Sequence, residues 1–164
     1  MEAAHKRRWQ TFEVVFGIPC LFAIALQWGL PLAFPRGWLT TIMVAAGMAL
    51  IVAGLALVVA ARRELARQAQ PTDPGNPTTQ LVTTGVFSVS RNPLYLGGVG
   101  LLVGIALAFN LPWLLVLLLP ALVACHTILI LPEEKYLTAT FGAEYARYRH
   151  SVPRWLGRRR VSTR

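Results

Sequence analysis

Two chemically rich segments stand out in this chain, and each adjoins a long apolar run. The first, LVTTGVFSVSRNPLYLG at residues 81–97, is polar and loop-like until it opens into such a run. The second is the acidic pair Glu133 and Glu134, which closes the run that follows. Two carboxylates at the end of a membrane span need partners or a task. The two segments predict a polar site at one end of a hydrophobic hairpin, suited to a cationic or hydroxyl-rich ligand. Because adjacent helical residues diverge by about 100°, the two carboxylates should have different partners.

The two segments are positioned by long uncharged runs that could each cross a membrane. The hydrophobic fraction is 55%, and residues 14–35, 37–61 and 92–132 carry no Lys, Arg, Asp or Glu. One spanning helix needs about 20 apolar residues, so the first two runs fit one span each and the third fits two. The sequence predicts a single domain, 1–164, that is an all-α integral membrane bundle of four transmembrane helices. The expected spans are about 12–34, 39–61, 94–109 and 113–131.

The placement of the basic residues predicts the orientation. If both termini are cytoplasmic, Arg36 is the one lysine or arginine on the outer side. This is a positive-inside pattern. The same placement argues against nucleic acid as the partner of the net charge of +9. Anionic lipid headgroups are the expected partner of the tail at Arg158, Arg159 and Arg160.

The chain after Pro132 has the pattern of an amphipathic helix. Leu137, Phe141, Tyr145 and Tyr148 repeat at spacings of four, four and three residues, which gives one apolar-aromatic face. A helix of this kind does not span a bilayer. We expect a cytoplasmic C-terminal helix that lies at the membrane surface or folds back over the inner mouth of the bundle.

Several features have a purely structural interpretation. Pro93 suits the first turn of a helix and Asn92 is a plausible N-cap, so the segment before residue 94 could simply start a helix. Cys20 and Cys125 are expected to be packing residues, and no metal-ligand spacing is present. Small residues would permit close helix contact or a homodimer. They fall on one face of each of two predicted spans: Ala45, Ala49 and Ala53, and Gly97, Gly100, Gly104 and Ala108.

The ordered set of motifs resembles the isoprenylcysteine carboxyl methyltransferase family, which is related to the phospholipid N-methyltransferases. The resemblance rests on residues 81–97, the acidic pair, the FGxxYxxY pattern at 141–148 and the VPR sequence at 152–154. It covers about residues 79–155. It implies an integral membrane enzyme that uses S-adenosylmethionine, leaves S-adenosylhomocysteine, and holds this cofactor at the cytoplasmic end of the helices.

Carried over position by position, the resemblance implies a set of site residues. Expected cofactor contacts are Gln70, Leu81, Val82, Gly85, Phe87, Asn92, Pro93, Tyr95, Glu133 and Glu134. Asn92 stands where the family has histidine. The catalytic candidates are His126, Tyr95 and Arg91. His126, seven residues before Glu133, would orient the acceptor or take its proton, and it could equally be a hydrogen-bonded packing residue.

The methyl acceptor stays open at this point. Members that act on prenylcysteine carboxylates have an arginine shortly before the acidic pair, and no arginine lies between Asn92 and Pro132 here. The expected acceptor is a small amphipathic or lipid-like molecule that enters from the bilayer and carries a carboxylate, an amine or a thiol. Two alternatives are an NAD(P)H-dependent membrane reductase similar to the C-terminal domain of sterol reductases, and a non-enzymatic scaffold or carrier. A bacterial inner membrane is the expected location.

Overall fold

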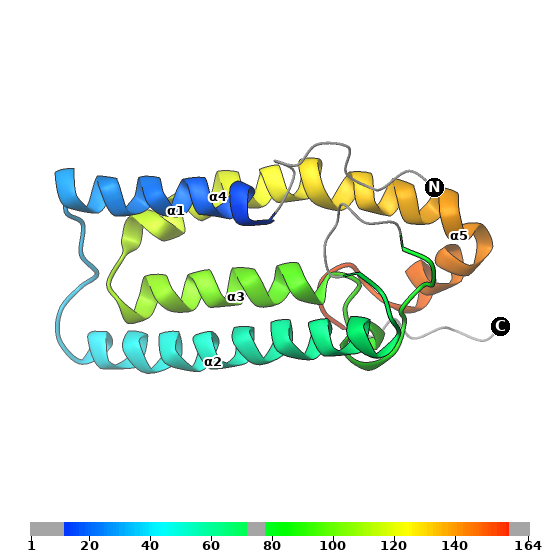
Figure 1. The fold of residues 1–164 in the computed structure, drawn as a ribbon. Helices are drawn as coiled ribbons and strands as arrows, with labels where there is room; N and C mark the ends of the chain where they lie inside the picture. Colours follow the sequence, from blue (N-terminus) through cyan, green and yellow to red (C-terminus); the bar gives the residue numbers. More distant parts are fainter. Residues whose placement is uncertain (1–11, 72–77, 158–164) are drawn as a thin grey trace.

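The computed structural model describes residues 12–71 and 78–157. Within these ranges all regular structure is helical, which confirms the all-α prediction (Figure 1). The elements are α1 (Phe12–Gly29), α2 (Trp38–Arg67), the 3-10 helix η1 (Gly85–Ser88), α3 (Pro93–Ala108), α4 (Pro112–Ala124), the π-helix η2 (Cys125–Ile130) and α5 (Leu131–Ser151).

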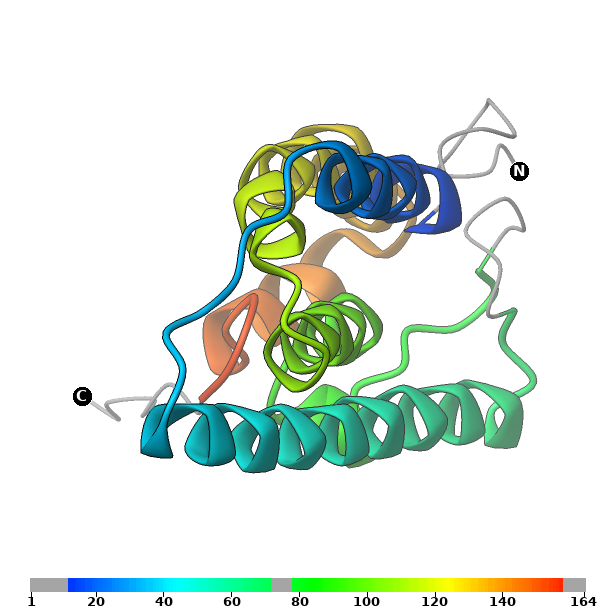
Figure 2. The same ribbon diagram turned by 90° about the vertical axis from the view of Figure 1, so that its left-hand side faces the viewer.

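The helices form two layers. α2 and α3 lie side by side and antiparallel in one layer, and α1 lies along α4 in the other (Figures 1 and 2). α3 also contacts α4, which joins the layers. The end of α2, the start of α3 and α5 therefore meet at one end of the molecule (Figure 1). This arrangement brings the two polar segments of the sequence together.

Glycines determine how closely α2 and α3 approach. A Cβ placed on Gly54 would lie 2.6 Å from the carbonyl oxygen of Gly97, and one on Gly47 would lie 2.7 Å from that of Gly104. Both distances are too short for a real side chain, so these backbones are in direct contact. The alanine face of α2 at Ala45, Ala49 and Ala53 does not make this contact, because those alanines are exposed. That this face permits contact with a second copy stays a prediction. Spacings of seven residues between glycines, rather than four between alanines, place the contact on the face toward α3.

The helix after α4 is longer and more continuous than the sequence suggests. α4, η2 and α5 run on as one helical segment, Pro112–Ser151, with Pro132 in the first turn of α5. A proline inside a helix loses one hydrogen bond and clashes with the carbonyl four residues earlier. The wider π-turn directly before Pro132 changes the hydrogen-bond spacing at the position where that clash would occur. The real change of direction comes at Gly142, whose φ of 47° favours glycine.

Two helices, Trp38–Arg67 and Pro112–Ser151, are long and apolar enough to cross a membrane. Pro93–Ala108 and the first helix are apolar but shorter. The first predicted span, 12–34, is too long, because α1 ends at Gly29, just before Leu30-Pro31. The residue before a proline is disfavoured in helical geometry, so helices tend to end there. Large apolar side chains such as Leu21 (70% exposed) and Trp28 (87% exposed) point outward, which fits a surface covered by lipid.

Candidate functional site

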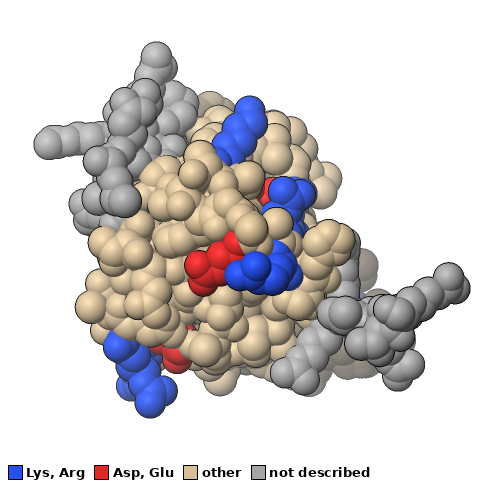
Figure 3. Space-filling model, turned by 90° about the vertical axis from the view of Figure 1, so that its right-hand side faces the viewer, with Lys and Arg blue, Asp and Glu red and all other residues tan. Residues whose placement is uncertain are grey.

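Charged side chains gather where α2 ends and α3 begins. Figure 3 shows acidic and basic side chains together on this end of the molecule. Beneath them is a cavity of about 300 Å³, at the lower end of the usual range for ligand pockets. Its walls come from α1, α2, the loop before α3, α3 itself and α5. The lining residues include Glu13, Val58, Arg62, Leu65, Thr78, Leu81, Val82, Phe87, Arg91, Asn92, Pro93, Leu94, Tyr95, Gly98, Leu101, Glu133, Tyr136, Leu137 and Tyr148.

The structure brings together most of the residues that the sequence singled out. Those that line the cavity are Leu81, Val82, Phe87, Arg91, Asn92, Pro93, Tyr95 and Glu133. They come from the loop, from α3 and from α5, and are separated by up to 52 positions in sequence. Gln70, Gly85, His126 and Glu134 do not line it.

The two adjacent carboxylates have different partners, as their divergence on a helix predicts. Glu133 faces the cavity, and its Oε2 accepts a hydrogen bond of 3.1 Å from the hydroxyl of Tyr95. Glu134 points to the other side, toward Arg91 and Arg154. Of the two adjacent carboxylates, Glu133 is thus the one that faces the cavity, which Glu13 of α1 also lines.

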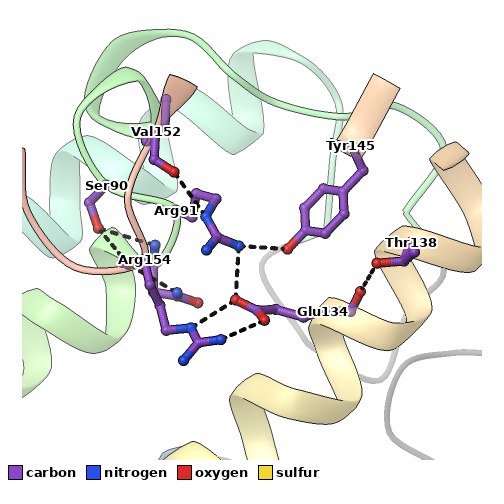
Figure 4. A network of polar contacts seen from close by, with 8 residues as sticks. Ser90, Arg91, Glu134, Thr138, Tyr145, Val152 and Arg154 are labelled. Atoms are coloured by element: carbon purple, nitrogen blue, oxygen red, sulfur yellow. Dashed lines mark hydrogen bonds and ion pairs between the residues drawn. The ribbon is translucent and has the colours of Figure 1, made fainter. Parts of the chain in front are cut away.

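Glu134 is the centre of a network of arginines (Figure 4). Its Oε1 accepts hydrogen bonds from Nη1 of Arg91 at 2.8 Å and from Nε of Arg154 at 2.9 Å, and its Oε2 accepts one from Nη2 of Arg154 at 2.8 Å. Arg91 also donates to the hydroxyl of Tyr145 at 3.1 Å. The hydrogen bond to Glu134 raises the pKa of Arg154 above its ordinary value. The carboxylate of Glu134 therefore links α5 to the start of α3 through Arg91 and to the segment after α5 through Arg154.

The segment after α5 is also held by hydrogen bonds to its backbone carbonyls. The backbone N–H of Arg91 donates to the carbonyl of Pro153 at 3.1 Å, and the Arg91 Nε donates to that of Val152 at 3.1 Å. The side chain of Asn92 donates to the carbonyl of Arg154 at 3.1 Å. The expectation that Asn92 caps α3 through its side chain is wrong, because that side chain reaches the C-terminal segment instead. Pro93 does stand in the first turn of α3.

Gln70 and Gly85 shape the loop without lining the cavity. Gln70 is buried, and its Oε1 accepts hydrogen bonds from the backbone N–H groups of Thr79 at 2.9 Å and Gln80 at 3.2 Å. Gly85 has a φ of +57°, and a Cβ there would lie 2.9 Å from the carboxylate of Glu64. Their expected contacts with a cofactor stay predictions, and the structure gives both residues a role in holding the loop.

His126 lies in the π-helix η2, away from the cavity lining. The expectation that it shares a face with Glu133 assumes an unbroken α-helix over seven residues. The π-turn spaces hydrogen bonds five residues apart instead of four, which shifts the register between the two residues. Its catalytic role stays a prediction.

Several lining residues were not singled out as site residues from the sequence. The hydroxyl of Tyr148 donates to the carbonyl of Phe87 at 2.7 Å, and that of Tyr136 accepts from the backbone N–H of Thr78 at 3.1 Å. Tyr136 follows Glu133 by three residues, so helical spacing could have placed both on one face. Arg62 and Glu13 sit on helices far from the motifs in sequence, and no local pattern indicates that they reach the site.

Comparison with known proteins identifies the family of this chain. Residues 42–144 match the family model described as phospholipid methyltransferase. The match covers more than half of the chain and includes α3, α4 and the acidic pair. The chain belongs to the phospholipid methyltransferase family, and its class is that of the membrane methyltransferases.

One curated relative is similar over part of the chain. Protein-S-isoprenylcysteine O-methyltransferase from Saccharomyces cerevisiae is 42% identical over 72 residues. This stretch is 44% of the present chain and 30% of that protein. The match confirms the resemblance to the isoprenylcysteine carboxyl methyltransferases and does not favour the reductase alternative. No solved structure matches the chain.

Proposed function

We propose that this protein is an integral membrane methyltransferase that uses S-adenosylmethionine and methylates a small amphipathic or lipid-like acceptor. The observation that carries the proposal is the cavity at the shared end of α2, α3 and α5. It combines an apolar wall with the inward-facing carboxylate of Glu133, and most of its lining lies within the residues matched by the family model.

The lining residues fit the chemistry of S-adenosylmethionine. Leu81, Val82 and Phe87 offer an apolar surface and backbone groups for the adenine ring. The carboxylate of Glu133 suits either the amino group or the ribose hydroxyls, and Asn92 adds a polar side chain to the same wall. When bound, the cofactor supplies a methyl group activated by its sulfonium centre.

The residues of this chain would then contribute by positioning and by excluding water. Holding a nucleophile and an electrophile in line can be worth about 7–11 kcal/mol of the barrier. Tyr148 lines one side of the cavity, and the Arg91–Glu134–Arg154 network holds α5 against the start of α3. We assign Tyr95 and Arg91, which both line the cavity, to orienting groups in it. His126 does not line the cavity, and its role as a proton acceptor stays a prediction.

We further propose that four helices cross the bilayer, with α1 and α3 completing the spans of α2 and the α4–α5 segment. In this topology both termini are cytoplasmic, and the part of α5 beyond Gly142 lies at the cytoplasmic surface. The basic residues Arg158, Arg159 and Arg160 lie outside the described residues, and we propose that they bind anionic lipid headgroups. A bacterial inner membrane and a homodimer are part of the same proposal.

Calorimetric titration of detergent-solubilised protein tests the cofactor, with S-adenosylhomocysteine and NADPH run in parallel. We expect binding of S-adenosylhomocysteine that weakens about tenfold or more in Glu133→Gln, because a hydrogen bond to a charged group is worth about 1.5–3 kcal/mol. Glu144→Gln is the matched control, since Glu144 is exposed on the same helix and does not line the cavity. Binding of NADPH alone would overturn the proposal.

A further inference from the structure

The loop at residues 81–89, which supplies three of the residues that line the cavity, is attached to the end of α2 through one carboxylate. Oε1 of Glu64 accepts a hydrogen bond from the hydroxyl of Thr84. It accepts a second one, of 3.1 Å, from Nε2 of Gln68, and this nitrogen also donates to the hydroxyl oxygen of Thr84 at 2.6 Å. The three side chains therefore form a closed ring of hydrogen bonds between the helix and the loop.

The residue after Thr84 allows the loop to lie this close to the carboxylate. Gly85 has a φ of +57°, which favours glycine, and a Cβ on it would lie 2.9 Å from Oε2 of Glu64. The side chain of Glu64 is only 15% exposed, although it stands near the end of its helix. The backbone of the loop is thus folded directly onto this side chain.

An ion pair along the helix does not explain the placement of Glu64. Its cationic partner on α2 is Arg67, whose Nη1 lies 3.9 Å from Oε2 and whose side chain is 81% exposed. Exposed pairs of this kind contribute little to stability. The hydrogen bonds of Glu64 are instead directed toward Thr84 and Gln68, so its main structural contact is with the loop.

The opposite side of the same loop is held by α5. The hydroxyl of Tyr148 donates to the carbonyl of Phe87 at 2.7 Å, within the turn of η1 that begins at Gly85. The loop is therefore attached once to α2 and once to α5. Releasing the attachment to α2 frees the start of η1, and with it the residues that face the cavity.

We propose that Glu64 is a positioning residue of the cofactor site. By accepting the hydrogen bond from Thr84, it fixes the loop at 81–89 in the position in which its apolar side chains line the cavity. Glu64 does not line the cavity itself, so it acts through the loop and not on the ligand. The inference rests on the proposed function for the identity of the ligand, and it adds a residue of α2 that none of the sequence motifs indicated.

The test combines two measurements on detergent-solubilised full-length protein. Calorimetric titration gives the affinity for S-adenosylhomocysteine, and amide hydrogen exchange without ligand reports the opening of residues 81–89. The variants are Glu64→Ala, Glu64→Gln, Thr84→Val and the double variant Glu64→Ala/Thr84→Val. Arg67→Gln is the matched control, because it removes the ion pair of Glu64 and leaves the contact with the loop.

We expect Glu64→Ala and Thr84→Val each to bind S-adenosylhomocysteine about tenfold more weakly and to exchange faster at 81–89, with unfolding midpoints close to that of wild type. The double variant should be no weaker than Glu64→Ala, because both changes remove the same hydrogen bond. Glu64→Gln should keep most of the affinity, since its amide oxygen still accepts from Thr84. Arg67→Gln should behave like wild type.

Wild-type affinity and exchange in Glu64→Ala would overturn the inference, as would additive losses in the double variant or an equal loss in Arg67→Gln. Thr84→Val asks the same question from the loop, so the answer does not depend on how well one variant folds. Failure of wild type to bind S-adenosylhomocysteine would instead refute the proposed function. Faster exchange at 81–89 in Glu64→Ala would in that case still support the attachment of the loop, and unchanged exchange would overturn it.

Discussion

Replacing Glu134 by alanine should separate its role from that of Glu133. The substitution removes three hydrogen bonds and leaves Arg91, whose side chain is 9% exposed, without its carboxylate. Breaking a buried ion pair from one side costs about 3–5 kcal/mol. Arg154 is 31% exposed and can turn to water, so its lost bonds add little. We expect a loss of about 3 kcal/mol in the free energy of unfolding.

The same reasoning predicts a smaller effect at the neighbouring position. Glu133 accepts one hydrogen bond from the rest of the described chain, the 3.1 Å bond from Tyr95, so Glu133→Ala should cost about 0.5–1.5 kcal/mol. The order should reverse for ligand affinity, with Glu133→Ala losing more affinity for S-adenosylhomocysteine than Glu134→Ala. Opposite orders of the two variants in stability and in ligand affinity would distinguish a residue that stabilises the fold from one that contacts the ligand.

Thermal unfolding in mild detergent, followed by size-exclusion chromatography, measures the stability part. For a chain of this size about 3 kcal/mol corresponds to a lower midpoint by roughly 6–12 °C. Glu144→Ala is the control for removing a carboxylate from α5, and its midpoint should stay close to that of wild type. If Glu134→Ala keeps the wild-type midpoint and loses S-adenosylhomocysteine binding, the reasoning is refuted and Glu134 is a cofactor ligand.

Three further substitutions test the packing around the site. Gly54→Ala should lower the unfolding midpoint by several degrees, because its Cβ would lie 2.6 Å from a backbone oxygen of α3; Gly17→Ala, with nothing within 4 Å, should be neutral or stabilising, and equal midpoints would contradict close α2–α3 contact. Gly85→Ala should cost about 1–2 kcal/mol in the unfolding free energy because of its φ of +57°. Tyr148→Phe removes the 2.7 Å hydrogen bond to Phe87 and should cost about 1 kcal/mol, with weaker S-adenosylhomocysteine binding by titration. Unchanged affinity in that variant would show that the contact does not hold the cavity wall.

The local pattern of residues determined the helical class and the place of the polar segments. Long uncharged runs and clustered charges are properties of sequence alone, and they predict where helices cross apolar surroundings. The order of residues 81–97, the acidic pair and the aromatic repeat was enough to indicate the family. Helical divergence was enough to predict that Glu133 and Glu134 have different partners, because the backbone geometry of a helix depends little on the rest of the fold.

The tertiary structure decided which of these residues face the same space. The π-turn at 125–130 and the glycine at 142 change direction and register in ways that no local pattern of α-helical spacing predicts. They place Glu134 between two arginines and leave His126 outside the cavity lining. Arg62 reaches the cavity because Gly54 and Gly97 allow α2 to pack directly on α3, a contact between residues 43 positions apart. Pairings of that kind depend on how helices dock, and helix docking is a property of the whole fold.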